Sequence, residues 1–520
     1  MMKQIIFFVA TLLTLTSVKA QDSVFTYTHQ GQTLYYIVDS NGEASVVPPL
    51  YPYHYFSLDT VTLEAWDGHT KPQGAVVVPD SVFFGSNNHP VTSIDFCAFY
   101  LCDSITSVTL PSTLRYIDSS AFEGCLRLET VALPSVDAID YSAFYNCAAL
   151  CSVTLPEGLT TIGGWAFSFC HNLQTVSFPS SLTQIGHHSF LFDTSLLALS
   201  IPSSVDTIHK YAFYLCTSLQ SVSLPEGLSF IDSMAFGECY NLSSIIIPPS
   251  ITSIPPGAFG LCENLQSVSL PEGLLSIGED AFLFCQRLEH IHLPSSLTSI
   301  GDVAFYLSGL TELLLPEGLT HLGFAPFGHC NNLHSVTIPS SLSSISYGCF
   351  SYNTSLSSVI IPEGVDTIKA QAFLNCPSLL NLSLPATLTV LEDSAFFGIT
   401  LDTLRLLSPV PPTIGNDVFT SFNTLLVVPC GSSQAYHQHP VWGLFSQIIE
   451  DCNAIEDTES DNLKIYLSNG HIVIEGAEGE TVQLFDLQGR QINTKHATLN
   501  TGVYLVKIGN RPAQKILLLD

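Results

Sequence analysis

The sequence predicts an α/β-type repeat solenoid, in which parallel β rungs alternate with short helical turns, followed by a small C-terminal antiparallel β-sandwich. One motif, Ala-Phe with a cysteine three positions later and then Leu-x-x-Val/Ile-x-Leu-Pro, returns along most of the chain. Its phenylalanine recurs every 23 residues, with two intervals of 22. A fixed period in the twenties is the signature of a solenoid. Residues 461–520 lack this period and contain alternating apolar stretches, which are typical of antiparallel strands.

The repeated phenylalanine marks fifteen registers, and each register predicts one rung. One rung alone cannot bury enough apolar surface to offset the cost of ordering its backbone, so the rungs must stack to fold. The fifteen residues are Phe99, Phe122, Phe144, Phe167, Phe190, Phe213, Phe236, Phe259, Phe282, Phe305, Phe327, Phe350, Phe373, Phe396 and Phe419.

The strand of each rung is expected just before the repeated proline. In the stretch LETVAL (128–133), Leu128, Val131 and Leu133 point inward, and the last three residues alternate as a strand should. Pro134 lacks an amide donor and ends the strand. A PEGL or PSSL turn and a second apolar pair then lead to the Ala-Phe segment.

That segment is expected to form a short helical turn that carries Ala-Phe inward. Asp or Gly often stands four positions before the Phe, where either residue suits a helix N-cap. Stacking would place Asp95, Asp118 and Asp140 in a column about 5 Å apart, which we call the aspartate column and which could hold calcium. The N-cap role explains them without an ion, and we expect no metal site and no cofactor. The residues at this position include Asp95, Asp118, Asp140, Gly163, Asp232 and Gly278.

Ten cysteines stand three positions after the repeated Phe. Stacked Cβ vectors run parallel, so a ladder of disulfides is disfavoured. Asp193, Ser308 and Asn353 replace the cysteine in other rungs, which points to a small buried side chain that bonds to backbone groups. The ten cysteines are Cys102, Cys125, Cys147, Cys170, Cys216, Cys239, Cys262, Cys285, Cys330 and Cys376.

Five cysteines lie outside this position. Cys430 and Cys452 flank an irregular, aromatic-rich segment, and they are predicted to form a disulfide that closes the C-terminal cap. Cys97, Cys151 and Cys349 are interpreted as packed small residues, and Cys151 is the thiol most expected to be exposed.

The two ends of the chain differ from the repeats. Residues 1–20 have the layout of a secretory signal peptide, and residues 21–78 predict a β-rich N-terminal cap with turns at HQGQ and DSNG. The rungs are placed at 79–429 and the C-terminal cap at 430–452, with a linker at 453–460. No stretch after the leader has 18 uninterrupted apolar residues, so no membrane span is expected.

The charge of the chain bears on its partners. It carries 45 acids and 15 bases, a formal net charge of −30, although charged residues make up only 12% of the sequence. Such a surface repels phosphate backbones, so nucleic acid is excluded as a partner.

The repeat consensus C-x-x-L-x-x-V-x-L-P-x-x-L-x-x-I-x-x-x-A-F resembles the treponemal-type, BspA-like leucine-rich repeat family over residues 79–429. The resemblance implies a surface or secreted protein of host-associated microbes. Members of that family act in adhesion to matrix proteins such as fibronectin and fibrinogen, in coaggregation or in host recognition. The resemblance brings no catalytic residues.

Residues 461–520 resemble the type A C-terminal sorting domain of type IX secretion, found in Gram-negative Bacteroidota. This implies a small β-sandwich that the type IX export machinery recognises, and hence a secreted or outer-surface location. The ending KILLLD departs from the commoner basic finish of that domain. The matching residues are Asp486, Gly489, Arg490, Gly502, Val503, Tyr504 and Lys507.

The outward strand positions form a shallow, mostly hydroxyl-lined face without a GxSxG or HExxH motif, so we expect no enzyme. The favoured function is a non-enzymatic adhesin for host matrix proteins or other cells. A glycan-binding accessory protein, which would need aromatic platforms on this face, and a structural surface-layer component remain alternatives. The candidate binding face consists of Thr109, Thr154, Ser177, Ser200, Ser223, Ser269, His292 and Thr337.

Two groups of histidines are candidate metal ligands. His290 and His292 are expected to share one strand face, and His187, His188 and His209 should meet across adjacent rungs. Exposed polar residues explain both groups without an ion.

Overall fold

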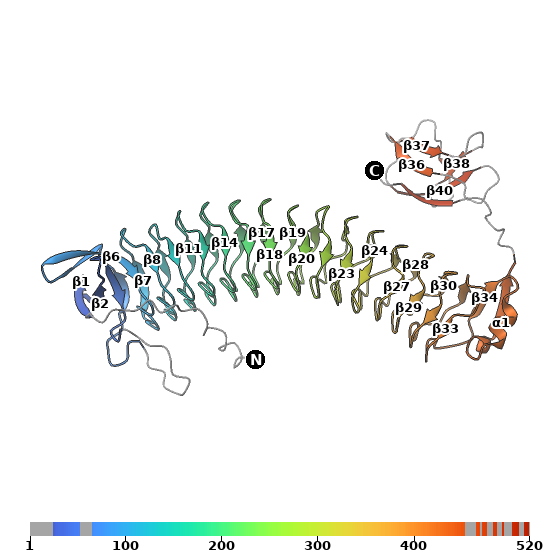
Figure 1. Cartoon of the computed structure of the whole chain (residues 1–520), viewed down its shortest axis with the longest axis horizontal. Coiled ribbons are helices and arrows are strands. Elements are labelled where there is room, and N and C mark those ends of the chain that lie inside the picture. Colours follow the sequence, from blue (N-terminus) through green and yellow to red (C-terminus); the bar gives the residue numbers. More distant parts are fainter. Residues whose placement is uncertain are drawn as a thin grey trace. The chain divides into compact units, whose positions relative to one another are not determined.

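The computed structural model describes residues 24–51 and 65–452, together with six strands between residues 464 and 518. Contacts divide the chain into two units, Met1–Asp451 and Cys452–Asp520. The first unit is a solenoid of stacked parallel rungs, which confirms the predicted fold class (Figure 1). The expected signal peptide and linker lie outside the described residues.

Every rung but that of His290 and His292 contributes to a first strand row, which overlaps the Val/Ile-x-Leu part of the motif. Neighbouring strands of this row pair in parallel, as in Val153 opposite Val176. β4 begins the row, although its residues were assigned to the cap from the sequence. The row consists of β4 (Gly74–Val77), β7 (Ile105–Thr109), β9 (Thr130–Ala132), β11 (Ser152–Thr154), β13 (Thr175–Ser177), β15 (Ala198–Ser200), β17 (Ser221–Ser223), β19 (Ser244–Ile246), β21 (Ser267–Ser269), β24 (Glu312–Leu314), β26 (Ser335–Thr337), β28 (Ser358–Ile360), β30 (Asn381–Leu384), β32 (Thr403–Leu406), β34 (Leu425–Pro429) and β35 (Gln447–Asp451).

A second strand row was not expected from the sequence. The isoleucine of the second apolar pair and the residue before it form a very short parallel strand, as in Ile162 opposite Ile185. This row consists of β3 (Ala44–Val47), β6 (Asn87–Ile94), β8 (Tyr116–Ile117), β10 (Ala138–Ile139), β12 (Thr161–Ile162), β14 (Gln184–Ile185), β16 (Thr207–Ile208), β18 (Phe230–Ile231), β20 (Ser253–Ile254), β22 (Ser276–Ile277), β23 (Ser299–Ile300), β25 (His321–Leu322), β27 (Ser344–Ile345), β29 (Thr367–Ile368), β31 (Val390–Leu391) and β33 (Thr413–Ile414).

The N-terminal end of the solenoid is covered by β1 (Phe25–His29), β2 (Gln32–Val38) and β5 (Ser81–Phe84). β1 and β2 form a hairpin whose turn residues, Gln30 and Gly31, have φ of 49° and 81°. Two left-handed residues in succession match the right-handed twist of a hairpin. β2 then pairs with β3, which joins the cap to the second strand row.

The expected short helical turns are wrong. The segment around each repeated Phe, which we call the turn row, makes successive tight turns whose residues two before and two after the Phe have positive φ, as at Trp165 (60°) and Phe169 (62°). Alternate amides therefore point along the stack, and Phe167 donates its N–H to the Ser189 carbonyl of the next rung at 2.8 Å. A helix would use these N–H groups within its own rung and leave the next rung unpaired.

The aspartates four positions before the Phe therefore cap no helix. Asp118 Oδ1 accepts a hydrogen bond from the N–H of Ser119, its immediate neighbour, at 2.6 Å, and Asp140 does the same with Tyr141 at 2.7 Å. Among the described residues the helices are α1 (Ser433–Gln438) and η2 (Trp442–Leu444), and both belong to the C-terminal cap.

The fifteen phenylalanines form one continuous stack through the core. Their ring centroids are 5.0 Å apart at Phe99–Phe122 and 5.9 Å apart at Phe396–Phe419. The rings are fully buried except at the last rung, where Phe419 is 8% exposed and packs edge-on against Trp442 and Phe445 of the cap. The stack thus runs unbroken from the first rung to the C-terminal cap.

The C-terminal unit contains antiparallel strands at the positions that the sequence indicated. They form one two-stranded sheet and one four-stranded sheet, and packing as a β-sandwich stays a prediction. Of the expected sorting residues, four lie in β40, while Asp486, Gly489 and Arg490 fall outside the described residues. The strands are β36 (Lys464–Ser468), β37 (His471–Glu475), β38 (Val482–Phe485), β39 (Gln491–Ile492), β40 (Gly502–Ile508) and β41 (Gln514–Leu518).

The stack predicts a sharp contrast between two phenylalanines of the same rung. Phe236→Ala removes a fully buried ring that contacts both neighbouring rungs, and we expect a loss of about 3–5 kcal/mol in the free energy of unfolding. Phe230→Ala removes a ring that is 49% exposed and should change stability by about 0.5 kcal/mol or less. Urea unfolding of the chain without its leader measures the free energy of unfolding of both variants. Equal losses would contradict a stabilising role of the phenylalanine stack.

Candidate binding surfaces

The cysteine row is part of the scaffold. Each thiol from the second rung on donates a hydrogen bond to the carbonyl of the Phe in the preceding rung, as Cys147 does to Phe122 at 3.2 Å. In one of the rungs without a cysteine, Asn353 Nδ2 makes the same bond to the Phe327 carbonyl at 3.0 Å. All of these thiols are free and buried, and burial raises their pKa values. The row therefore offers no reactive thiolate. The donors are Cys125, Cys147, Cys170, Cys216, Cys239, Cys262, Cys285, Cys330 and Cys376.

The five other cysteines divide into two groups. Cys430 and Cys452 are both disulfide-bonded. Cys97 and Cys349 are buried free thiols, whereas Cys151 is exposed.

Asp193 is the exception in the cysteine row. Its side chain is fully buried, its Oδ1 accepts the N–H of Cys170 at 2.8 Å, and its Oδ2 has no hydrogen-bond partner. Burial raises the pKa of Asp193 well above its ordinary value. This shift favours the protonated, neutral form of the carboxyl, which suits a position that elsewhere holds a neutral donor.

The outer face of the first strand row matches the candidate binding face only in part. Seven of its eight residues are exposed, and Thr337 is half-buried. The exposed residues are Thr109, Thr154, Ser177, Ser200, Ser223, Ser269 and His292. Their role in binding stays a prediction.

Large aliphatic side chains also stand exposed on this face, including Ile449, which is 48% exposed in the last strand, β35. Ile246 is 72% exposed, and Leu314 and Ile360 are each 59% exposed. Strand register places Leu314, Thr337 and Ile360 opposite one another on successive rungs. The C-terminal half of the face is therefore more apolar than the hydroxyl-lined N-terminal half.

The expectation that His290 and His292 share a strand face is wrong, because their rung has no strand in the first row. The following rung is one residue shorter at its corner. There Gly309 lies so close to Gln286 that an added Cβ would stand 2.2 Å from the Gln286 carbonyl oxygen. We attribute the break in the strand row to this offset of the corner.

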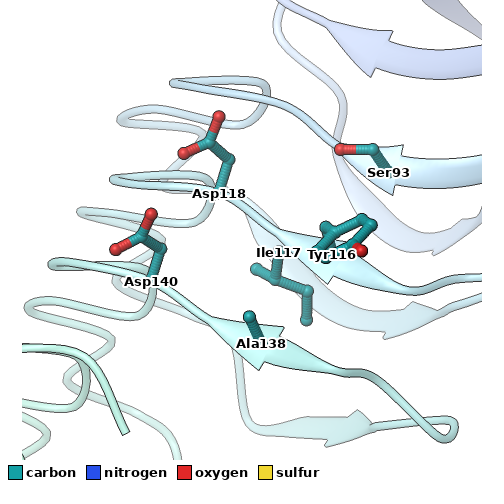
Figure 2. Close-up of a pocket in the computed structure, with 6 residues that line it drawn as sticks. All are labelled: Ser93, Tyr116, Ile117, Asp118, Ala138 and Asp140. Carbon is teal, nitrogen blue, oxygen red and sulfur yellow. The ribbon is translucent and has the colours of Figure 1, made fainter. Parts of the chain in front are cut away.

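A shallow groove of about 310 Å³ lies where the second strand row meets the aspartate column. Figure 2 shows the Asp118 and Asp140 carboxylates on the same side of the groove, one rung apart, with Tyr116 on β8, the strand that leads to Asp118. Burial, together with the nearby Asp118 carboxylate, raises the pKa of Asp95 to about 7. Asp95 is thus partly protonated near neutral pH, which weakens it as a ligand for a cation.

Neither proposed metal group assembles as a compact ligand set. Within the described part of the chain, the close groups of three or more His, Cys, Asp and Glu ligand atoms include neither the aspartate column nor His187, His188 and His209. His188 instead lies between the rings of Trp165, at 4.2 Å, and Tyr211, at 4.8 Å. Burial lowers the pKa of His188 to about 4, so its imidazole is neutral at pH 7.

His188, Trp165 and Tyr211 belong to a surface that was not expected from the sequence. We call it the aromatic patch. Trp165 and His188 stack in parallel, and so do Phe169 and Phe192, at 5.2 Å. Tyr145 touches both columns, at 6.1 Å from Trp165 and 5.3 Å from Phe169. The patch lies on the turn row, whereas the glycan alternative placed aromatic residues on the strand face. Its half-buried members are Tyr145, Trp165, Phe169, His188, Phe192, Tyr211 and Tyr214.

A stack of near-identical rungs with two parallel strand rows defines a leucine-rich repeat solenoid. The family model described as BspA type leucine rich repeat region matches this sequence in six copies, over residues 84–196, 189–311 and 298–425. The chain therefore belongs to the BspA-type leucine-rich repeat family. A search of curated proteins finds no match.

Solved structures of other proteins are similar to this chain. A leucine-rich repeat protein from Bacteroides ovatus is 26% identical with a TM-score of 0.51, and the match covers 71% of this chain and 95% of that one. A leucine-rich cell surface protein from Faecalibacterium prausnitzii is 23% identical with a TM-score of 0.36 and coverages of 77% and 96%. The pneumococcal vaccine antigen PcpA is 21% identical with a TM-score of 0.44 and coverages of 75% and 95%.

Asp193 supplies a test of the cysteine row. A carboxyl whose pKa is raised by folding binds more protons in the folded than in the unfolded chain, so its contribution to stability falls as pH rises above about 4. Asp193→Asn supplies the neutral amide seen at Asn353 and should stabilise the chain by about 1–3 kcal/mol at pH 8. The gain should shrink at pH 4. Thermal unfolding at both values measures it, and a gain independent of pH would contradict a buried neutral acid.

Proposed function

We propose that this chain is a secreted or cell-surface adhesin that recognises host matrix proteins or other cells through the outer face of the first strand row. Leucine-rich repeat proteins are typically non-enzymatic binding scaffolds, and BspA-type members suggest a protein-binding role. The observation that carries the proposal is the exposed face itself, where Ile246, Leu314 and Ile360 stand among hydroxyl side chains. Apolar side chains displayed on a rigid sheet are the usual anchors of protein interfaces.

The location is part of the proposal. Family membership suggests an extracellular or surface protein, and the signal-peptide pattern and the type IX resemblance support export through that machinery. Within the described residues no helix is long and apolar enough to cross a bilayer.

The direct test is binding of the chain without its leader to immobilised fibronectin and fibrinogen, with a salt titration. Saturable binding supports the adhesin. Self-association without binding to either protein would favour the structural surface-layer alternative and overturn the proposal. A steep loss of affinity with salt would assign part of the interaction to the acidic surface.

Two matched substitutions locate the contact. Leu314→Asp and Ile360→Asp place charges where an apolar partner surface would be buried, and we expect binding to weaken at least about ten-fold, which corresponds to about 1.4 kcal/mol. Phe230→Asp alters a residue of the second strand row that is 49% exposed and should leave binding unchanged. Surface plasmon resonance measures the affinity of each variant. Equal losses of affinity in all three variants would contradict binding through the first strand row.

A further inference from the structure

The backbone under the aromatic patch is strained for the residues it carries. Trp165, Phe169, His188, Phe192 and Tyr211 all have φ between 57° and 66°. Left-handed backbone costs a residue with a side chain roughly 1–2 kcal/mol, and an aromatic stack returns about 0.5–1.5 kcal/mol. Four other rungs carry glycine at one of these positions, namely Gly124, Gly257, Gly348 and Gly398, and most carry a side chain, such as Leu101 or Met234. Positive φ is therefore general to the turn row. The clustering of large rings on adjacent rungs sets the patch apart and points to a role in recognition.

We propose that the aromatic patch binds a neutral oligosaccharide. This site is separate from the first strand row and does not depend on the proposed adhesion. The patch combines rigid apolar rings with a few polar groups at their rims, including the tyrosine hydroxyls. Sugars present apolar C–H faces bordered by hydroxyl groups, and a binding site for them needs this combination.

Local charge favours a neutral ligand. In the three turn segments 163–171, 186–194 and 209–217, the single acid is Asp193, which is buried. Lys210 lies 5.0 Å from the Tyr211 ring, and at one end of the patch Glu238 accepts hydrogen bonds from the Tyr214 and Tyr240 hydroxyls. At the other end of the patch, the turn segment of Tyr145 carries the exposed Asp140, and the Glu123 carboxylate interacts electrostatically with Tyr145. The centre of the patch is thus free of exposed carboxylates, while the net charge of −30 repels anionic polymers at long range.

The size of the patch favours an oligosaccharide over a protein. Its rings run from the rung of Phe144 to that of Phe213, which is three rung spacings, or about 15 Å at about 4.8 Å for each spacing. A stable protein interface needs about 800 Å² from each partner, more than such a narrow strip offers. The rings are already held by stacking, so a ligand loses little free energy in ordering them.

Tryptophan fluorescence reports on this site alone. The chain has three tryptophans, and Trp66 and Trp442 are only 2% and 0% exposed, so a ligand on the patch meets Trp165. The full chain without its leader would be titrated with neutral cello-, chito-, manno- and xylo-oligosaccharides. We expect a saturable shift in emission with at least one series. Tyr211→Ala and Tyr145→Ala should weaken that binding at least ten-fold.

Tyr347→Ala is the matched control, because Tyr347 stacks on Phe324 at 5.2 Å in a separate part of the turn row. It should keep full affinity, and all three variants should unfold within a few degrees of the parent chain. No response to any neutral series, or full affinity in Tyr211→Ala, would overturn the proposal. So would a response confined to acidic sugars or to a matrix protein. Binding of these variants to fibronectin should be unchanged, which separates this site from the strand face.

Discussion

The constraint on which the structure depends is that the polar backbone of each turn segment must be satisfied by the next rung. The N–H of Phe167 reaches the Ser189 carbonyl, and the N–H groups of Trp165 and Phe169 bond to the same neighbouring segment. The phenylalanine stack holds the rungs at the separation these bonds require, and the thiol of each cysteine returns a bond to a Phe carbonyl. Because these contacts are made between rungs, an isolated rung has little reason to adopt this conformation.

Contacts between rungs also bear on the turns after the repeated proline, where PEGL-type and Pro-Ser/Ala-type turns mostly alternate from Pro225 onward. Glu157, in a PEGL turn, accepts hydrogen bonds from the N–H and hydroxyl of Ser180 in the PSSL turn of the next rung, at 3.0 Å each. Glu317 and Ser340 repeat the arrangement, and Glu363 accepts the N–H groups of Ala386 and Thr387. The carboxylate thus links its rung to the next, which favours a pair of rungs as the unit of this solenoid. Growth by duplication of such pairs keeps the bonded partners together.

The periodic part of the fold could be predicted because every rung repeats the same buried residues. A pattern that recurs in fifteen registers identifies the buried positions even where a single rung departs from it. The conformation of the turns could not be predicted, because an aspartate before Ala-Phe is as typical of a helix N-cap as of a tight turn. In the structure, Asp118 accepts a hydrogen bond from the N–H of the next residue. The second strand row contributes only two residues in most rungs, too few to give a periodic signal. The aromatic patch was missed because Trp165 and Phe169 are turned outward by positive φ, which periodicity does not reveal.

The division of each rung into buried positions, which we call fixed, and solvent-exposed positions, which we call free, bears on function. The Phe, the cysteine and the inward aliphatic residues are held by contacts with both neighbouring rungs, so a change there disturbs the whole stack. Side chains on the outer strand face and on the left-handed turn positions meet solvent, and they vary from Ser177 to Ile360 and from Gly124 to Trp165 without altering the backbone. Specificity in this molecule must therefore come from where unusual side chains cluster on these free positions. The two clusters that depart most from the repeat are the exposed aliphatic residues of the strand face and the rings of the turn row, and they lie on different sides of the rungs. One chain can thus present two independent binding surfaces on a single scaffold.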